Sequence, residues 1–332
     1  MMPKVTVALS VYNVSSYLRE SMNCIISQKY TDLEILCIDD ASTDETWEIL
    51  NEYAQVDTRI RLIRQEKNQG LSVSRNLAIR EANGEYIVML DGDDLFAPEM
   101  IERAVSVAEK TNAEMVLWDY SVFYDGQKIS HFNECRSVLV GMSSTDKLSL
   151  LKRPAFMWTR LLKTEVLKKL GIHFTEGLTK QDIPIHWQLV TSLDRISIIP
   201  ERLVYYRQQP GSTTNRKGKS LFSLAYVMDI VKDNLISNNI YNQFKNEFLR
   251  SRLSLLQGMY DCIFPDLKDE ALMMVKERLG QDEQAYISNP QNELSSRVRD
   301  FYGMLNGDRM ALIRYRGLHA IRSIYRFFKK PM

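Results

Sequence analysis

Three carboxylates lie close together where an apolar stretch of the sequence ends. Asp91, Asp93 and Asp94 follow the run YIVML at residues 86–90. Neighbouring carboxylates repel one another and are costly to desolvate, so packing alone gives no reason for this cluster. It is either a solvated turn or a set of oxygen ligands for a hard divalent cation. Asp94 suits an N-cap for a helix near Pro98, whereas Asp91 and Asp93 can both turn towards one cation.

Strand-like and helix-like stretches alternate through the first third of the chain. The stretches typical of strands are residues 4–11, 33–38, 59–64, 85–90 and 113–123. Helical spacing of apolar residues fills the intervals, and a Ser-x-x-Glu capping box at 42–45 is predicted to open one helix. This alternation predicts an α/β fold built on a parallel sheet with right-handed crossovers.

Polar groups follow four of the predicted strands. In an open parallel sheet, ligands bind beyond the carboxyl ends of the strands, so these groups are predicted to converge on one edge. They occupy the segments 10–13, 39–42, 68–70 and 91–94. Agreement among four strand ends favours a ligand site over four unrelated turns.

The first of these turns argues against a dinucleotide site. A Rossmann fingerprint places three glycines directly after the first strand, and the segment SVYNVSSY at 10–17 contains none. Bound phosphates would therefore need a cation held by carboxylate oxygens. Gly92, between Asp91 and Asp93, is expected to leave room for a diphosphate.

Four motifs in register give the chain a recognisable pattern. LSVYN, LEILCIDDASTDET, NQGLSVSRN and GEYIVMLDGDD occur in this order, and together they resemble family 2 glycosyltransferases of the GT-A fold. The similarity covers residues 3–123 tightly. A weaker similarity continues through 156–190 and 203–213, which resemble the acceptor side of bacterial polysaccharide-type members. The resemblance implies an α/β GT-A fold with a mainly parallel, Rossmann-like sheet.

The resemblance also implies roles on the nucleotide side of the site. Tyr12 would lie against the nucleobase with Ser10 near it, and Asp40 would bond the base edge, most typically of uracil. Asn68 and Arg75 would border the nucleotide. Asp40 could instead compensate a helix dipole, and Arg75 could be an ordinary surface arginine.

Further roles concern the metal and the reaction. Asp91 would act towards the ribose and the metal, and Asp93 would be the direct ligand of Mn²⁺ or Mg²⁺ in a DxD motif. Asp182 would be the general base, unless it is only a first-turn helix acid before a proline. Arg207 would lie on a loop that closes over the diphosphate. Gln181 departs from the family pattern, in which an acidic residue usually precedes the base.

The implied reaction moves a sugar from a nucleotide-sugar donor, most typically a UDP-sugar, to a hydroxyl of a saccharide or lipid-linked saccharide. One base and in-line displacement would invert the anomeric centre. A non-catalytic GT-A module that binds nucleotide or another transferase is the alternative. A phosphohydrolase with an aspartate nucleophile is disfavoured, because that class needs Thr or Val where Leu95 stands.

The pattern changes beyond the predicted fifth strand. We expect a glycosyltransferase domain over 1–215, divided into a nucleotide-binding part at 1–123 and an acceptor part at 124–215, and a helical region over 216–332. A hairpin turn is predicted at YDGQ, and a loop at QQPGSTTNRKGKS. His186 could contact the acceptor or the metal, but a packed or partly exposed histidine is expected. Trp158 is expected to be a core or acceptor-wall residue.

Composition narrows the partners and the compartment. A net charge of +1 gives no basic field for nucleic acid, and four scattered cysteines without CxxC spacing favour a reducing environment. No leader pattern or membrane-spanning run is evident, so a cytoplasmic protein is expected. The tail at 308–330 is basic and amphipathic. It could bind an anionic membrane surface, dock on its own core or pair with a second subunit as a homodimer.

Overall fold

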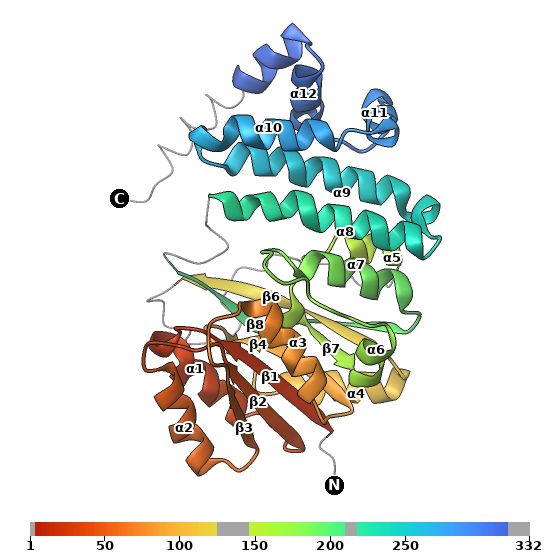
Figure 1. Cartoon of the computed structure of the whole chain (residues 1–332). Helices are drawn as coiled ribbons and strands as arrows, with labels where there is room; N and C mark the ends of the chain where they lie inside the picture. Colours follow the sequence, from red (N-terminus) through yellow and green to blue (C-terminus); the bar gives the residue numbers. More distant parts are fainter. Residues whose placement is uncertain (1–3, 125–145, 210–217, 318–332) are drawn as a thin grey trace. The chain divides into compact units, whose positions relative to one another are not determined.

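The computed structural model describes residues 4–124, 146–209 and 218–317 (Figure 1). The chain forms two compact units, residues 1–215 and 216–332, each of which is described by itself. The predicted hairpin turn at YDGQ, most of the predicted loop at 208–220 and the tail beyond residue 317 lie outside the described residues.

The first half of unit one alternates strands and helices as the sequence predicts. Its elements are β1 (Val5–Val11), α1 (Ser15–Ile26), β2 (Leu33–Asp39), α2 (Thr46–Val56), β3 (Ile60–Arg64), α3 (Leu71–Glu81), β4 (Tyr86–Asp91), β5 (Leu95–Phe96), α4 (Met100–Thr111) and β6 (Met115–Tyr124). The second half contributes α5 (Lys147–Leu151), the 3-10 turn η1 (Met157–Thr159), β7 (Arg160–Lys163), α6 (Thr164–Lys169), α7 (Asp182–Ser192) and β8 (Ile196–Gln208).

These strands form one mixed sheet in the order β3-β2-β1-β4-β7-β6-β8-β5. Neighbouring strands from β3 to β4 are parallel, and β6 is parallel to β8. β7 and β5 pair antiparallel to their neighbours, so the sheet is mixed, and the prediction of a mainly parallel sheet is confirmed. The register places Ser10 opposite Asp91 and Val11 opposite Asp39, which brings three strand ends to one edge.

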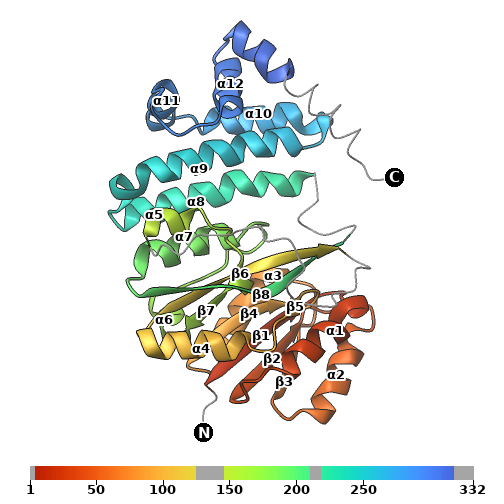
Figure 2. The same ribbon diagram turned by 180° about the vertical axis from the view of Figure 1, so that it is seen from behind.

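Helices cover both faces of the sheet, as Figures 1 and 2 show for α3 and α4. Alternate residues of β1, including Val7 and Leu9, pack with α1, α2 and α4 in one apolar cluster. Because side chains alternate along a strand, Ser10 and its neighbour Asp91 point to the opposite face, where α3 contacts β1. The pleat therefore assigns these two polar side chains to the side of the sheet that carries Arg75.

Two predicted helix caps are wrong. Ser42 does not open α2, which begins at Thr46; the Ser42 hydroxyl instead accepts a hydrogen bond from the Asn13 N–H at 3.0 Å. Asp94 does not cap α4, whose N-cap is Glu99 and makes no side-chain cap bond. In both cases the side chain that local spacing had assigned to a helix cap bonds instead to a residue near the end of another strand.

Unit two is helical, as the sequence predicts. It contains η3 (Lys219–Phe222), α8 (Ser223–Ser237), α9 (Tyr241–Cys262), η4 (Pro265–Leu267), α10 (Lys268–Glu277), α11 (Gln281–Ser288) and α12 (Ser296–Leu305), followed by helical residues 309–317. In this last helix Ala311 and Tyr315 are buried, and the Tyr315 hydroxyl donates to Asp261 on α9. Across the described part of both units, every helix is too short or too polar to span a bilayer.

Candidate active site

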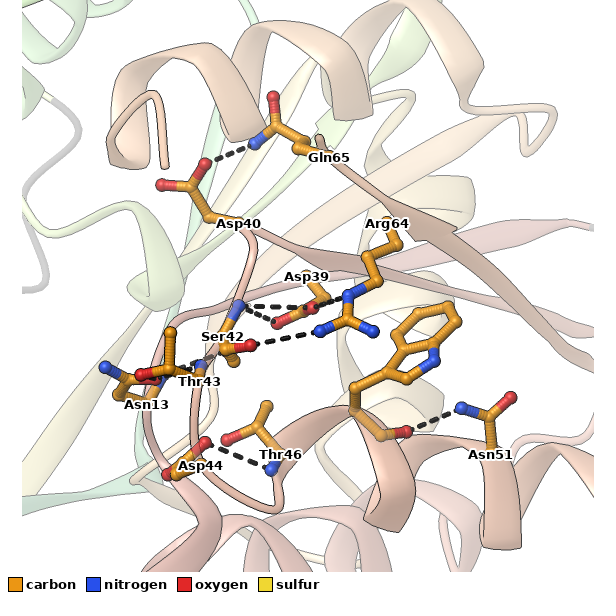
Figure 3. A network of polar contacts seen from close by, with 11 residues as sticks. Asn13, Asp39, Asp40, Ser42, Thr43, Asp44, Thr46, Asn51, Arg64 and Gln65 are labelled. Carbon is orange, nitrogen blue, oxygen red and sulfur yellow. Dashed lines mark hydrogen bonds and ion pairs between the residues drawn. The ribbon is translucent and has the colours of Figure 1, made fainter. Parts of the chain in front are cut away.

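The loops after β1 and β2 are tied together at the predicted nucleotide side (Figure 3). The Thr43 N–H donates to Asn13 Oδ1 at 2.8 Å, and the Asn13 N–H donates to Ser42. Asn13 adopts a left-handed conformation with φ 50° that Asn tolerates better than most residues. Next to it, Tyr12 is 44% exposed, so its ring is accessible for stacking against a planar base.

The adjacent aspartates Asp39 and Asp40 have different surroundings. Asp39 is fully buried, accepts a hydrogen bond from the Ser42 N–H, and lies 3.2 Å from Arg64 Nε. These contacts account for its carboxylate within the fold. Asp40 projects to the other side of this turn in Figure 3, towards Gln65.

The Asp40 carboxylate organises the entrance to α3. Oδ1 accepts hydrogen bonds from Gln65 Nε2 at 2.7 Å and from the Gln69 N–H at 2.8 Å, and Oδ2 accepts from the Gly70 N–H at 2.7 Å. Gly70 has a φ of 89°, a positive value that glycine adopts more readily than other residues. Three donors hold the Asp40 carboxylate in place. A contact between Asp40 Oδ2 and the edge of a nucleobase stays a prediction. Asn68 lies exposed in the same loop.

Arg75 joins two carboxylates from distant parts of the chain. Its side chain is only 3% exposed, so the surface-arginine alternative is wrong. Nη2 lies 3.0 Å from Asp91 Oδ1, and Nη1 donates to Asp182 Oδ1. The guanidinium also lies over the ring of Phe174 at 5.6 Å. A single guanidinium thus connects the end of β4 with the start of α7.

Asp182 begins α7 and has the surroundings of a group that could take a proton. Burial raises the pKa of its carboxyl, Arg75 and Arg160 lower it, and Asp91 raises it. The Met157 N–H donates to the carboxylate and fixes its orientation. Just before it, Lys180 holds a left-handed φ of 61°, a strained backbone of the kind that collects at functional sites.

The turn after β4 presents Asp93 and buries Asp94. Burial and the neighbouring Asp91 carboxylate raise the pKa of Asp93 to about 6, against a hydrogen bond from Gln209 Nε2 at 2.9 Å. Asp94 is fully buried; its Oδ1 accepts from the Arg207 N–H at 2.8 Å, and its Oδ2 has no hydrogen-bond partner within the described ranges. Burial and the two neighbouring aspartates raise the pKa of Asp94 well above its usual range.

Arg207 supports this turn. The prediction that it lies on a loop is wrong. It belongs to β8 and is 5% exposed. Nε donates to the Asp93 backbone carbonyl at 2.8 Å, and Nη2 pairs with Glu20. The guanidinium lies 4.7 Å from the ring centres of both Tyr17 and Phe123. In this position it holds the carboxylate-bearing turn, and contact with a diphosphate stays a prediction.

The side chains fit a cation that receives part of its coordination from a ligand. Within residues 4–124, 146–209 and 218–317, no three His, Cys, Asp or Glu side chains converge on a metal-sized site. Asp91 and Asp93 could supply two oxygens. Burial and then the neighbouring Asp91 carboxylate raise the pKa of Asp93, and a bound cation would oppose both effects. A Cβ at Gly92 would meet Val11 Cγ1 at 2.7 Å, so packing also favours glycine there, and room for a diphosphate stays a prediction.

Sequence reasoning did not identify Arg160 as part of this region. It is 1% exposed, and burial lowers its pKa to about 10. Nη1 lies 3.3 Å from His186 Nδ1, while His186 Nε2 lies 3.1 Å from the Leu150 carbonyl, so His186 is packed as predicted. The RLLK stretch that carries Arg160 looks like an ordinary strand, and only its position beside α7 distinguishes it.

Comparison with known proteins adds independent information. Residues 6–171 match the model for glycosyl transferase family 2. The chain is 29% identical over 220 residues to an uncharacterized glycosyltransferase, EpsJ, of Bacillus subtilis, covering 64% of each chain. It is 27% identical over 243 residues to the glycosyltransferase GlyG of Streptococcus pneumoniae, covering 69% of this chain and 77% of GlyG.

Two solved structures share the fold. TarS of S. aureus, in complex with UDP-GlcNAc, superimposes with a TM-score of 0.58 at 17% identity, covering 91% of this chain and 92% of that one. The mannosyltransferase PcManGT of Pyrobaculum calidifontis, in complex with GDP-Man and Mn²⁺, gives a TM-score of 0.51 at 17% identity, covering 86% and 83%. The fold, the four strand-end motifs and the family match agree: the chain belongs to glycosyl transferase family 2.

Proposed function

We propose that this protein transfers a sugar from a nucleotide-sugar donor, a UDP-sugar, to a hydroxyl of a saccharide or lipid-linked saccharide. The observation that carries the proposal is the link through Arg75 between Asp91, at the nucleotide edge, and Asp182, the candidate base. The complexes of TarS with UDP-GlcNAc and of PcManGT with GDP-Man and Mn²⁺ support a nucleotide-sugar donor.

Asp182 carries the proton transfer in this proposal. Its carboxylate accepts the proton of the acceptor hydroxyl as the acceptor oxygen bonds to the anomeric carbon. The bond from that carbon to the diphosphate oxygen breaks, and its electron pair leaves with the diphosphate. A base on one side and a leaving group on the other invert the anomeric centre. Arg75 and the Met157 N–H orient the carboxylate for this step.

Asp93 and Asp91 would hold Mn²⁺ or Mg²⁺, which as a Lewis acid offsets the negative charge that develops on the leaving diphosphate. The protein supplies two carboxylates that repel one another and a turn held by Arg207. With only two such side chains, the site is expected to bind the cation weakly alone and more tightly together with a nucleoside diphosphate.

The test combines a binding assay with a turnover assay. Mn²⁺ together with UDP is expected to raise the melting temperature, and Asp93→Ala should abolish the increase, while Asp194→Ala, at a side chain that is 89% exposed, should preserve it. Release of nucleoside diphosphate from a panel of nucleotide sugars then identifies the donor. An undiminished shift in Asp93→Ala rejects the metal site, and nucleotide binding without release from any donor favours the non-catalytic alternative.

We also propose contact with an anionic membrane surface, which would suit a lipid-linked acceptor. In the helix at 309–317, Met310 is 60% exposed and Ile313 is 63% exposed, on the side opposite the buried Ala311 and Tyr315. Arg309 and Arg316 are exposed on the same short helix. An exposed apolar pair with flanking arginines is typical of an interfacial helix.

A further inference from the structure

Four aromatic rings cluster beside the candidate base. Phe156 and Trp158 stack with ring centres 4.7 Å apart and planes 11° apart, and Tyr120 meets both edge-on at 5.5 and 5.0 Å. Tyr206, on β8, lies 5.7 Å from Phe156 and 5.3 Å from Trp158. Tyr120 and Trp158 are buried, whereas Phe156 and Tyr206 remain partly exposed. The cluster therefore has a packed base and an accessible side.

The peptide unit between Phe156 and Met157 connects this cluster to the candidate base. Its carbonyl accepts hydrogen bonds from Thr159 Oγ1 at 2.8 Å and from Arg160 Nε and Nη2 at 3.2 and 3.0 Å. Its N–H donates to the Asp182 carboxylate. One planar peptide group thus anchors the backbone of Phe156 and contacts the candidate base.

The hydrogen bonds of Arg160 to the Phe156 carbonyl explain why this arginine is buried beside the aromatic cluster. Placing a guanidinium at 1% exposure is costly, and the pKa of Arg160 is lowered accordingly. Two of its donors serve the Phe156 carbonyl, and its third nitrogen faces His186. Such a rigid support beneath a partly exposed ring is what a binding surface needs, because it removes the entropy cost of ordering the surface on binding.

We propose that Phe156 and Tyr206 form an acceptor platform that binds the apolar face of a pyranose ring. The proposal rests on glycosyl transfer as the function and adds the residues that hold the acceptor saccharide, which presents a ring with axial C–H groups. Those C–H groups pack against the electron-rich ring faces, and the equatorial hydroxyls stay free at the edge. The bond from the Met157 N–H places the backbone next to Phe156 beside Asp182, and we expect a hydroxyl of the stacked sugar to lie within reach of that carboxylate.

A sugar-binding experiment tests the platform without any need for donor turnover. Saturation-transfer difference NMR, with irradiation of the aromatic protons of the full chain, is recorded with the methyl β-glycosides of glucose, galactose and N-acetylglucosamine. Transfer to the C–H protons of at least one glycoside is expected. Phe156→Leu, which keeps an apolar side chain and removes the ring, should at least halve that signal. Phe264→Leu makes the same change at a 48% exposed ring in unit two and should leave it unchanged.

Kinetics with the best-bound glycoside as acceptor separate binding from chemistry. In Phe156→Leu the KM for the acceptor should rise about tenfold with a much smaller change in kcat, as loss of an aromatic contact predicts. Absence of any glycoside signal in the wild-type protein, or equal signals in wild type and Phe156→Leu, overturns the platform while donor turnover still supports glycosyl transfer. No turnover from any donor overturns the transferase proposal, and the platform with it.

Discussion

The guanidinium of Arg75 donates to the carboxylate of Asp182, although 107 residues separate them in the sequence. The same guanidinium lies 3.0 Å from Asp91 through its other terminal nitrogen. A planar fork with two donor nitrogens holds two carboxylates at a fixed separation, whereas the rotatable donors of an ammonium do not fix that separation. Arg75 therefore sets the distance between the end of β4 and the start of α7.

Arg75→Lys is expected to lower kcat for sugar transfer by about 10²-fold, because a lysine keeps the charge but does not fix the positions of the two carboxylates relative to one another. Transfer kinetics with the donor identified from the nucleotide-sugar panel measure the effect. Arg103→Lys is the matched control, since Arg103 is 56% exposed and pairs with one carboxylate at 3.4 Å. Equal kcat values for wild type and Arg75→Lys would show that the bridge has no role in the reaction.

The half of the candidate site that follows from strand ends could be predicted from the sequence. Side chains that leave neighbouring parallel strands must meet at one edge, and the pairing of Ser10 with Asp91 shows that they do. The Arg75 to Asp182 contact could not be derived from spacing, because no local periodicity links residues 107 apart. The burial of Asp94 was missed because it depends on Arg207 arriving on β8.

Protonation of Asp93 gives a dependence of stability on pH. Its pKa in the folded protein, about 6, lies above the ordinary 3.8, so between these values the folded state binds more protons than the unfolded state. Asp93 thus contributes stability at low pH that is lost as the pH rises through about 6. In EDTA, Asp93→Asn should therefore raise the melting temperature at about pH 8 and lose that advantage at about pH 4.

Asp194→Asn is the control for this pH comparison, because its carboxylate is 89% exposed. Its effect on the melting temperature should be small and nearly the same at both pH values. A stabilisation by Asp93→Asn that is equally large at both pH values would mean that charge on Asp93 does not destabilise the folded protein.

Ala41 carries backbone strain between Asp40 and Ser42. Its φ of 60° is a left-handed conformation that costs an L-residue roughly 1–2 kcal/mol, while glycine loses about 0.5–1 kcal/mol more in conformational entropy on folding. Ala41→Gly should therefore stabilise the protein by about 0.5–1 kcal/mol, measured as a shift in the urea midpoint. Ala82→Gly, at φ −64°, should destabilise it. Destabilisation by both changes would argue against strain at Ala41.

Sequence reasoning located most strands of unit one but not every helix start or strand direction. Periodicity located β1, β2, β4 and β6 because each is an apolar run that must be buried, and β3 because its apolar and charged residues largely alternate. It misplaced the start of α2, since Ser42 and Glu45 have the spacing of a capping box, whereas the Ser42 hydroxyl accepts a hydrogen bond from the Asn13 N–H in the loop after β1. The direction of β7 could not be predicted either, because a four-residue strand with two apolar residues does not reveal whether it pairs parallel or antiparallel.

The exposed pair Met310 and Ile313 provides the test of membrane contact. Replacing both with glutamate should reduce co-sedimentation with vesicles that contain anionic lipid by about tenfold, because it removes apolar contact and adds repulsion from the lipid charge. Neither side chain packs in the fold, at 60% and 63% exposure, so the melting temperature should change little. Met273→Glu, at 64% exposure on α10, controls for an added charge in the same unit. Equal sedimentation of the double variant and wild type would reject contact with a membrane surface. If the mass of wild type alone increases with concentration, Met310 and Ile313 instead lie in a contact between two copies of the chain.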